Sequence, residues 1–240
     1  MLFAMVVIVG AGASFVGISA VHPPTAATAS TGSVAPAADP PAFNMRKYTL
    51  DAPSSRWVVV DKLRPLNPRK YEPSDLVRVS IPRTFSATIR REANTALTLM
   101  NKEFVQSHPK YGLVVHSGYR SYATQKAVWD GDYTLTALPG YSEHQTGWAV
   151  DLAGKNGKCA IYECFANTTE GKWLAANSYK YGFILRYPKG MQNVTGYQFE
   201  PWHYRYVGTL LSIEMHNRNI KTLEQFFGLP NAPKYGVGGH

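Results

Sequence analysis

Two short segments of the chain carry residue types that could bind a metal ion. Residues 142–151 (SEHQTGWAVD) place the imidazole of His144 seven positions before the carboxylate of Asp151. Residues 200–203 (EPWH) place Glu200 three positions before a second imidazole, His203. Two His and one Asp suit a zinc ion and leave its fourth coordination position open for water. The spacing therefore predicts a three-ligand zinc site.

Such a site could hydrolyse a peptide at neutral pH, because zinc lowers the pKa of a bound water to about 7. Glu200 could act as the general base and then return the proton to a leaving amine. Residues three apart on a regular strand face opposite sides, so Glu200 and His203 converge only if Pro201 marks a bend. We expect that bend in the structure.

A third segment, residues 117–125 (SGYRSYATQ), could recognise a carboxylate. Gly118 allows a tight exit from a preceding strand and places Arg120 just before a helix that Ser121 could cap. An arginine can bind a carboxylate through two charge-assisted hydrogen bonds, worth about 1.5–3 kcal/mol each. Gln125, in the first helical turn, could add a polar contact on the same side.

The sequence pattern of residues 46–240 predicts the strands and helices that must position these segments, and together they indicate an α+β domain. This range is long enough for one substantial core. β-Branched or alternating patterns predict strands at 57–60, 113–115, 148–152 and 202–206. Helices are expected at 84–107, 121–130, 170–181, 207–217 and 222–227. The first of these has apolar residues at three- and four-residue spacing. The irregular order of strands and helices favours a mixed or mainly antiparallel sheet with helices packed on it.

The N-terminal part of the chain, residues 1–45, differs in composition from residues 46–240, which we call the body. Residues 1–45 contain no Lys or Arg and a single acid, Asp39. Residues 2–21 are uncharged and could span a membrane, whereas residues 27–29 (ATA) resemble a signal-peptide cleavage site. We therefore expect a signal peptide or a membrane anchor over 1–29 and a linker rich in Pro, Ala, Ser and Thr over 30–45.

Charge and cysteine content exclude some classes of partner and fold for the body. All 25 Lys and Arg lie in residues 46–240 with 15 acids, a net charge of +10. The body has no helix-turn-helix, zinc-finger or RNA-binding signature, so the charge points to an anionic polymer rather than to nucleic acid. Two cysteines are too few for a disulfide-stapled small fold or a four-cysteine zinc module.

The body resembles the VanY-type zinc D-alanyl-D-alanine carboxypeptidases, within the lysostaphin/D-Ala-D-Ala-metallopeptidase/hedgehog group. The pattern S-x-H-x-x-G-x-A-x-D is met by residues 142–151, and E-x-W-H is met by residues 200–203. Residues 117–125 meet the S-G-Y-R-S stretch with its later Gln. Less specific matches extend the similarity over roughly residues 56–210.

The resemblance implies roles for individual residues. The zinc ligands would be His144, Asp151 and His203, with Glu200 as the catalytic base. Four residues would recognise a peptidoglycan stem peptide that ends in D-Ala, and these are Arg120, Ser121, Gln125 and Ser142. The family's fold is a small α+β domain with a central antiparallel sheet. Zn²⁺ is the implied cofactor, and the implied location is extracytoplasmic, either secreted or membrane-anchored and facing an anionic wall polymer.

Two other functions remain open at this stage. An L,D-carboxypeptidase would trim D-Ala from a tetrapeptide stem. The tetrapeptide and the D,D-substrate both end in a D-alanine carboxylate, so binding of that carboxylate by Arg120 does not distinguish them. A wall-binding module could instead retain zinc without catalysis, although it would need no base such as Glu200. A serine enzyme is disfavoured, because Pro109 interrupts the S-x-x-K match at 107–110 and no companion motif is present. A helix-based H-E-x-x-H zinc site is absent.

Cys159 and Cys164 lie close together in the sequence, between the expected strand that carries Asp151 and the next helix. Outside the cytoplasm a local disulfide is the favoured state of such a pair. Closing so short a loop would contribute about 2 kcal/mol.

Overall fold

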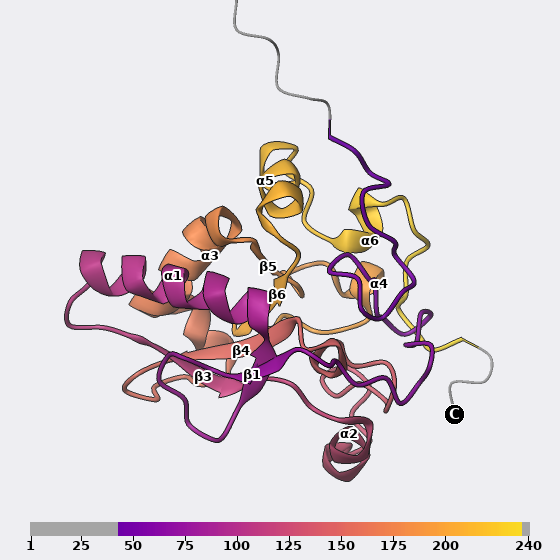
Figure 1. Ribbon diagram of the computed structural model, residues 1–240, viewed down its shortest axis with the longest axis horizontal. Coiled ribbons are helices and arrows are strands. Elements are labelled where there is room, and N and C mark those ends of the chain that lie inside the picture. Colours follow the sequence, from indigo (N-terminus) through magenta and orange to yellow (C-terminus); the bar gives the residue numbers. More distant parts are fainter. Residues whose placement is uncertain (1–42, 237–240) are drawn as a thin grey trace, which may run out of the picture. The chain divides into compact units, whose positions relative to one another are not determined.

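A four-stranded sheet carries the candidate metal-binding segments identified above. In the computed structural model, which describes residues 43–236, the spatial order of its strands is β3-β4-β6-β5 (Figure 1). All three pairings are antiparallel. The strands are β3 (Leu113–Ser117), β4 (Ala149–Gly154), β5 (Phe183–Leu185) and β6 (His203–Tyr206). A separate antiparallel pair consists of β1 (Leu76–Arg78) and β2 (Thr88–Arg90).

Alternation along β4 and β6 gives the sheet a core face and a site face. Val150 and Tyr204 pack in the main apolar cluster. Asp151 and His203 alternate with them and therefore point to the opposite face. The strand pairing then places Asp151 directly opposite His203. Local sequence periodicity and register together bring two candidate ligands side by side.

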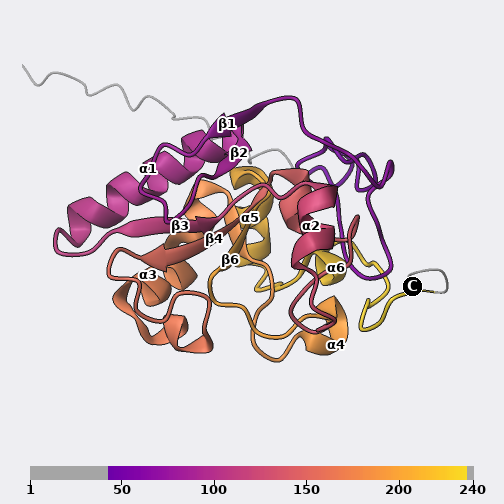
Figure 2. The same cartoon turned by 90° about the horizontal axis from the view of Figure 1, so that it is seen from below.

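Helices cover the core face. Figure 1 shows α1 (Arg91–Ser107) and α3 (Thr169–Asn177) on one side of β3 and β4, with α2 (Tyr122–Val128) on the other. Phe104 of α1 contacts Trp173 of α3 with ring centroids 5.2 Å apart. Figure 2 gives a second view of this arrangement. The remaining helices are α4 (Gln192–Thr195), α5 (Thr209–Asn217) and α6 (Leu223–Phe226). Three short 3-10 helices are η1 (Glu143–Thr146), η2 (Glu163–Asn167) and η3 (Ser178–Tyr181).

The expected fold class, α+β with a mainly antiparallel sheet in one domain, is confirmed. Three of the four expected strands form, whereas β1, β2 and β5 are not predicted from the sequence. Helix α1 starts at Arg91 rather than at 84, because residues 88–90 pair with β1 instead. The expected helix over 170–181 divides into α3 and η3.

The expected strand at residues 57–60 is wrong. These residues are buried, but they form no ladder, and Val59 makes a single backbone hydrogen bond to Leu50 (N···O 2.9 Å). Their side chains alternate between two apolar clusters, with Val58 and Val60 in one and Trp57 and Val59 in the other. The apolar pattern at 57–60 therefore arises because both sides of an extended segment are buried, and not because the segment belongs to a sheet.

The described part of the chain begins with contacts to this segment. Phe43 stacks on Trp57 with centroids 5.5 Å apart, so contacts of the body start at least three residues before position 46. Across residues 43–236, no helix combines the length and apolar character needed to cross a bilayer. The expected signal or anchor at 1–29, and most of the expected linker, lie outside the described residues.

Candidate active site

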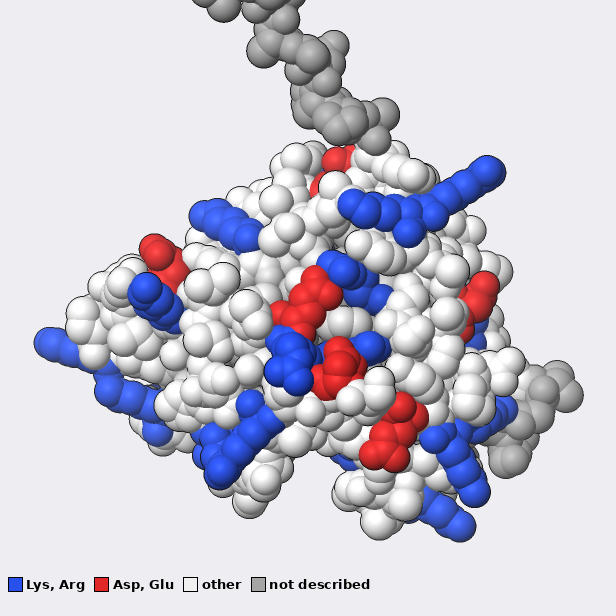
Figure 3. Space-filling view, in the orientation of Figure 1, with Lys and Arg blue, Asp and Glu red and all other residues white. Residues whose placement is uncertain are grey.

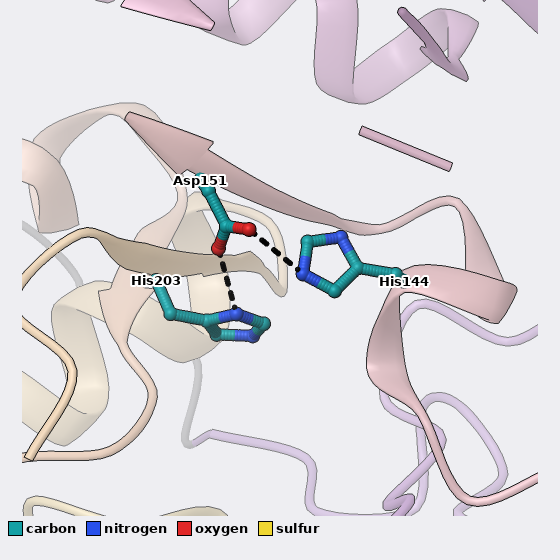
Figure 4. Close-up of side chains that lie close together, drawn as sticks. All are labelled: His144, Asp151 and His203. Carbon is teal, nitrogen blue, oxygen red and sulfur yellow. Dashed lines mark hydrogen bonds and ion pairs between the residues drawn. The ribbon is translucent and has the colours of Figure 1, made fainter. Parts of the chain in front are cut away.

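Three elements bring the candidate metal ligands together. His144 lies in η1, Asp151 in β4 and His203 in β6, and their side chains point toward one another (Figure 4). Gly147 ends η1 with a left-handed backbone (φ 71°) and turns the chain directly into β4. This turn lets a histidine and an aspartate that are close in sequence face the same point.

The distances between these side chains fit a small metal ion. Nε2 of His144 is 3.2 Å from Asp151 Oδ2, and Nδ1 of His203 is 3.1 Å from Asp151 Oδ1. One ligand atom from each residue lies within 4.8 Å of the others, and all three residues are buried. Metal bonds of about 2.0–2.2 Å at tetrahedral angles separate donor atoms by about 3.4 Å. The donor set and its spacing therefore suit zinc.

The backbone fixes the ring of His144. Its Nδ1 lies 2.7 Å from the carbonyl oxygen of Gly118, which leaves Nε2 facing Asp151. A side chain at position 118 would place its Cβ 2.6 Å from the carbonyl oxygen of Thr88, so this approach requires glycine. A ligating histidine that donates its other ring N–H to a carbonyl has a fixed tautomer. Burial, the largest influence, also lowers the pKa of His144 and favours the neutral imidazole.

The predicted bend at Pro201 is present. The amide of His203 donates to the carbonyl of Glu200 (3.1 Å) in a tight turn, which brings Glu200 Oε2 within 3.9 Å of His203 Nδ1. Glu200 Oε1 is buried and has no hydrogen-bond partner among the described residues. Burial raises the pKa of Glu200 to about 8. A carboxylate with this pKa, buried beside the candidate metal ligands, could exchange a proton at neutral pH.

A second carboxylate at the site, Glu143, was not singled out from the sequence. Its Oε2 lies 3.3 Å from His203 Nε2, and its Oε1 accepts hydrogen bonds from Arg186 Nε (2.8 Å) and Arg205 Nη1 (2.7 Å). Burial alone would raise the pKa of Glu143, but the two guanidinium groups outweigh it and hold that pKa well below its usual range. No local signal marks Glu143, because its arginine partners are distant in sequence.

Arg120 and Gln125 meet in the same cleft, which has a volume of about 370 Å³. Arg120 Nη1 donates to Gln125 Oε1 (3.0 Å), and Nη2 donates to Ser117 Oγ (3.2 Å). Gln125 is fully buried and is held by a bond from its Nε2 to the carbonyl of Ala137 (2.7 Å). The guanidinium is therefore held in place at the wall of a cleft that the three candidate metal ligands and Glu200 also line.

Comparison with known proteins identifies the family. Residues 86–209 match the family described as VanY, D-alanyl-D-alanine carboxypeptidase. The chain belongs to the VanY family. It is 39% identical over 193 residues to a putative carboxypeptidase, YodJ of Bacillus subtilis (strain 168), and the match spans 75% of this chain and 69% of that protein. The match to the D-alanyl-D-alanine carboxypeptidase of Enterococcus faecium is 40% identical but spans only 47% of this chain and 35% of that protein.

Solved structures of related enzymes share this fold. The LdcB LD-carboxypeptidase superposes with a TM-score of 0.68 at 38% identity, over 75% of this chain and 88% of that one. A variant of the vancomycin-resistance D,D-pentapeptidase VanY in complex with Zn(II) gives a TM-score of 0.58 at 26% identity, over 72% of this chain and 98% of that one. The chain is therefore a carboxypeptidase of the VanY family.

Two residues assigned to substrate recognition occupy different positions in this VanY-family chain. Ser142 lines the cleft, as the resemblance implied. Ser121 caps α2 by accepting a hydrogen bond from the amide of Thr124 (3.1 Å) and is not among the residues that line the cleft. Its hydroxyl is engaged because the first turn of a helix leaves backbone amides that need an acceptor.

The cleft has further walls that the sequence did not indicate. Tyr187 and Tyr197 line it, and the ring of Tyr187 lies 4.8 Å from that of His203. Cys159 and Cys164 are joined in a disulfide with Cα atoms 5.5 Å apart. The loop that they close carries Ile161, another residue of the cleft wall. Aromatic and aliphatic side chains thus surround the polar centre.

Proposed function

We propose that this carboxypeptidase is zinc-dependent and releases the terminal D-alanine of peptidoglycan stem peptides by D,D-cleavage. One observation carries the proposal, namely that His144, Asp151 and His203 converge beside Glu200 in the cleft that holds Arg120. A metal-ligand set, a proton acceptor and a carboxylate-binding group are the parts that hydrolysis at a chain end requires. The E. faecium relative is named a D-alanyl-D-alanine carboxypeptidase, and the VanY structure contains Zn(II).

His144, Asp151 and His203 would hold the ion. When bound, zinc would supply a Lewis acid that polarises the scissile carbonyl and lowers the pKa of a water. Glu200 Oε1, which has no partner within the described part of the chain, would take the proton of that water and pass it to the nitrogen of the departing D-alanine. A nearby cation favours the ionised carboxylate, so Glu200 can accept a proton despite its burial.

Arg120 would bind the terminal carboxylate of the substrate. Ser117 and Gln125 fix its guanidinium and leave further N–H donors for a ligand. A fixed bidentate clamp selects a free chain end and orients the last peptide bond for attack. This role explains why the cleft would favour carboxypeptidase over endopeptidase activity.

A second candidate is an L,D-carboxypeptidase that acts on the tetrapeptide stem. It is favoured by the greater similarity to the LdcB LD-carboxypeptidase, at 38% identity, than to the VanY D,D-pentapeptidase, at 26%. Both substrates end in a D-alanine carboxylate that Arg120 would bind equally.

The deciding experiment is to incubate the zinc-loaded full chain with pentapeptide and tetrapeptide stems and to measure released D-alanine. Release from the pentapeptide supports the proposal, whereas release from the tetrapeptide alone replaces it with the L,D alternative. The control is Glu200→Gln, which should bind zinc normally and lose activity by about 10²- to 10⁴-fold. If the zinc-loaded protein released no D-alanine from either stem peptide, the enzymatic proposal would be wrong and a non-catalytic wall-binding module would be the remaining function.

The location of action is part of this proposal. A disulfide such as Cys159–Cys164 persists in oxidising compartments, which supports action outside the cytoplasm on the cell wall. The N-terminal residue of the mature protein, determined from exported material, distinguishes a cleaved signal peptide from a retained anchor. A protein recovered only from the cytoplasm would contradict the assignment.

A further inference from the structure

We propose that Glu143 is a positioning residue that holds the ring of His203, and that a buried network of charges holds Glu143 in turn. The carboxylate engages Nε2 of His203, so that Nδ1 faces the other two metal-binding residues. This proposal rests on the metal site of the proposed function.

The contacts of the His203 ring define this role. Its Nδ1 lies 3.1 Å from Asp151 Oδ1, and its Nε2 lies 3.3 Å from Glu143 Oε2. Both nitrogens are therefore engaged, one on each side of the imidazole. A histidine that ligates through one nitrogen commonly donates the other N–H to a carboxylate, which fixes the ring and increases its basicity as a ligand. His144 has the equivalent support from the carbonyl of Gly118.

Two arginines prevent the Glu143 carboxylate from turning. Oε1 accepts from Arg186 Nε at 2.8 Å and from Arg205 Nη1 at 2.7 Å, and all three side chains are fully buried. Arg205 follows His203 by two positions on β6, so both side chains lie on the same face of the strand. Strand β6 thus supplies both His203 and Arg205, and Arg205 fixes Glu143, the hydrogen-bond partner of His203.

The arginines are themselves anchored. Arg186 makes a bidentate pair with Glu224 of α6, with Nη1···Oε2 at 3.0 Å and Nη2···Oε1 at 2.6 Å. Arg205 Nη2 donates to the carbonyls of Arg56 (3.1 Å) and Val58 (2.9 Å). The buried segment at 57–60, which forms no strand, therefore contributes a carbonyl to the support of the site. Two carboxylates balance two guanidinium groups, so the network carries its charges in pairs.

Other roles for Glu143 fit the geometry less well. Both of its oxygens are occupied, unlike those of Glu200, so it offers no free atom to accept a proton from water. Its Oε2 engages Nε2, the ring nitrogen that does not face Asp151, and the residue is outside the metal-binding cluster. A purely stabilising role is disfavoured, because buried ion pairs often add no more stability than apolar residues of similar size.

The network offers a matched pair of variants for the test. Glu143→Gln and Glu224→Gln each neutralise a fully buried carboxylate that accepts from Arg186, but only Glu143 contacts His203. Zinc affinity of the full chain is measured by competition with a chelator at fixed pH, after thermal unfolding shows that each variant is folded. We expect zinc to bind about 10- to 100-fold more weakly to Glu143→Gln. Glu224→Gln should remain within about 3-fold of wild type, because the loss of affinity arises from the group that contacts the ligand directly. Equal losses in both variants, or no loss in Glu143→Gln, would overturn the proposal.

A second measurement needs no variant. In zinc-loaded wild-type protein with ¹⁵N-labelled histidine, we expect the Nε2 of His203 to carry a slowly exchanging proton. A proton found on Nδ1 instead would overturn the proposal. Wild-type protein that binds zinc but releases no D-alanine would contradict the proposed function alone, and both readouts would still decide the role of Glu143. Wild-type protein that binds no zinc would contradict both.

Discussion

At the residue scale, two glutamates that flank His203 have opposite properties. Burial raises the pKa of Glu200 to about 8. Glu143 is as deeply buried, but Arg205 and Arg186 outweigh the effect of burial and keep its pKa well below the usual range. A group that accepts and then returns a proton works best with a pKa near the ambient pH. Glu200 therefore suits proton transfer, whereas Glu143 suits a fixed negative charge.

The protonation of this centre predicts a pH dependence of zinc binding. Burial disfavours the charged His203 ring, but its hydrogen bonds to Asp151 and Glu143 outweigh burial and raise its pKa to about 9. In the metal-free protein at pH 7, His203 and Glu200 therefore both hold a proton, and a ligating nitrogen must lose its proton to bind zinc. We expect zinc affinity to increase between pH 7 and 9, with about one to two protons released per ion at pH 7. Calorimetry in two buffers of different ionisation enthalpy measures this number, and a value of zero would contradict the prediction.

Arg120 predicts a dependence on the free chain end. Loss of one or two charge-assisted hydrogen bonds of about 1.5–3 kcal/mol each should lower kcat/KM by at least about 10-fold in Arg120→Ala. The wild-type enzyme should lose a similar factor when the terminal carboxylate of the peptide is replaced by an amide. The variant should then barely distinguish acid from amide. A variant that still strongly prefers the acid would show that another group binds the carboxylate.

At the element scale, short helices and turns position the side chains of the site at one face of the sheet. The left-handed Gly147 ends η1 and aims His144 at Asp151, and the turn at Pro201 aims Glu200 at His203. The start of α2 places Arg120 next to the cleft while Ser121 satisfies the helix terminus. The positions of the candidate catalytic groups thus depend on where helices, strands and turns begin and end.

The capping role of Ser121 can be tested separately from substrate binding. Ser121→Ala should lower the free energy of unfolding by about 1 kcal/mol, because the Thr124 amide loses its acceptor. Ser121→Asp keeps an acceptor and should retain the stability of the wild-type protein. Denaturant unfolding measures the stability, and kcat/KM for the stem peptide should stay close to wild type in both variants. A loss of kcat/KM in Ser121→Ala with unchanged stability would show that Ser121 binds the substrate rather than capping the helix.

At the scale of the whole molecule, the excess positive charge is not gathered at one place on the face drawn in Figure 3. Lys and Arg side chains occupy several separate areas of that face, with Asp and Glu between them. Charge dispersed in this way over a face attracts a polyanion weakly and without a defined track on that face. Under the proposed function, we expect this charge to affect encounter with an anionic wall polymer rather than the chemistry in the cleft.

This dispersion predicts two different responses to salt. Retention of the protein on an anionic wall polymer should fall steeply between about 0.05 and 0.5 M salt, because screening shortens the range of surface charges. Release of D-alanine from a small soluble peptide should change by less than about 3-fold over the same range, since His144, Asp151, His203 and Glu200 are buried and salt screens buried charges much less. Co-sedimentation and a soluble assay measure the two responses. Salt-resistant retention would indicate a specific polymer site.

By itself, the sequence determined which residues are candidate metal ligands and catalytic groups, and it determined the fold class. Alternation on β4 and β6 and the bend at Pro201 are local features, and local periodicity is visible in a sequence. Only the tertiary structure decided what surrounds those residues. Glu143, Arg186, Arg205 and Glu224 meet across separations of 38 to 62 positions. No periodicity links such distant charges, because their contacts arise from the packing of β6, α6 and the buried segment at 57–60.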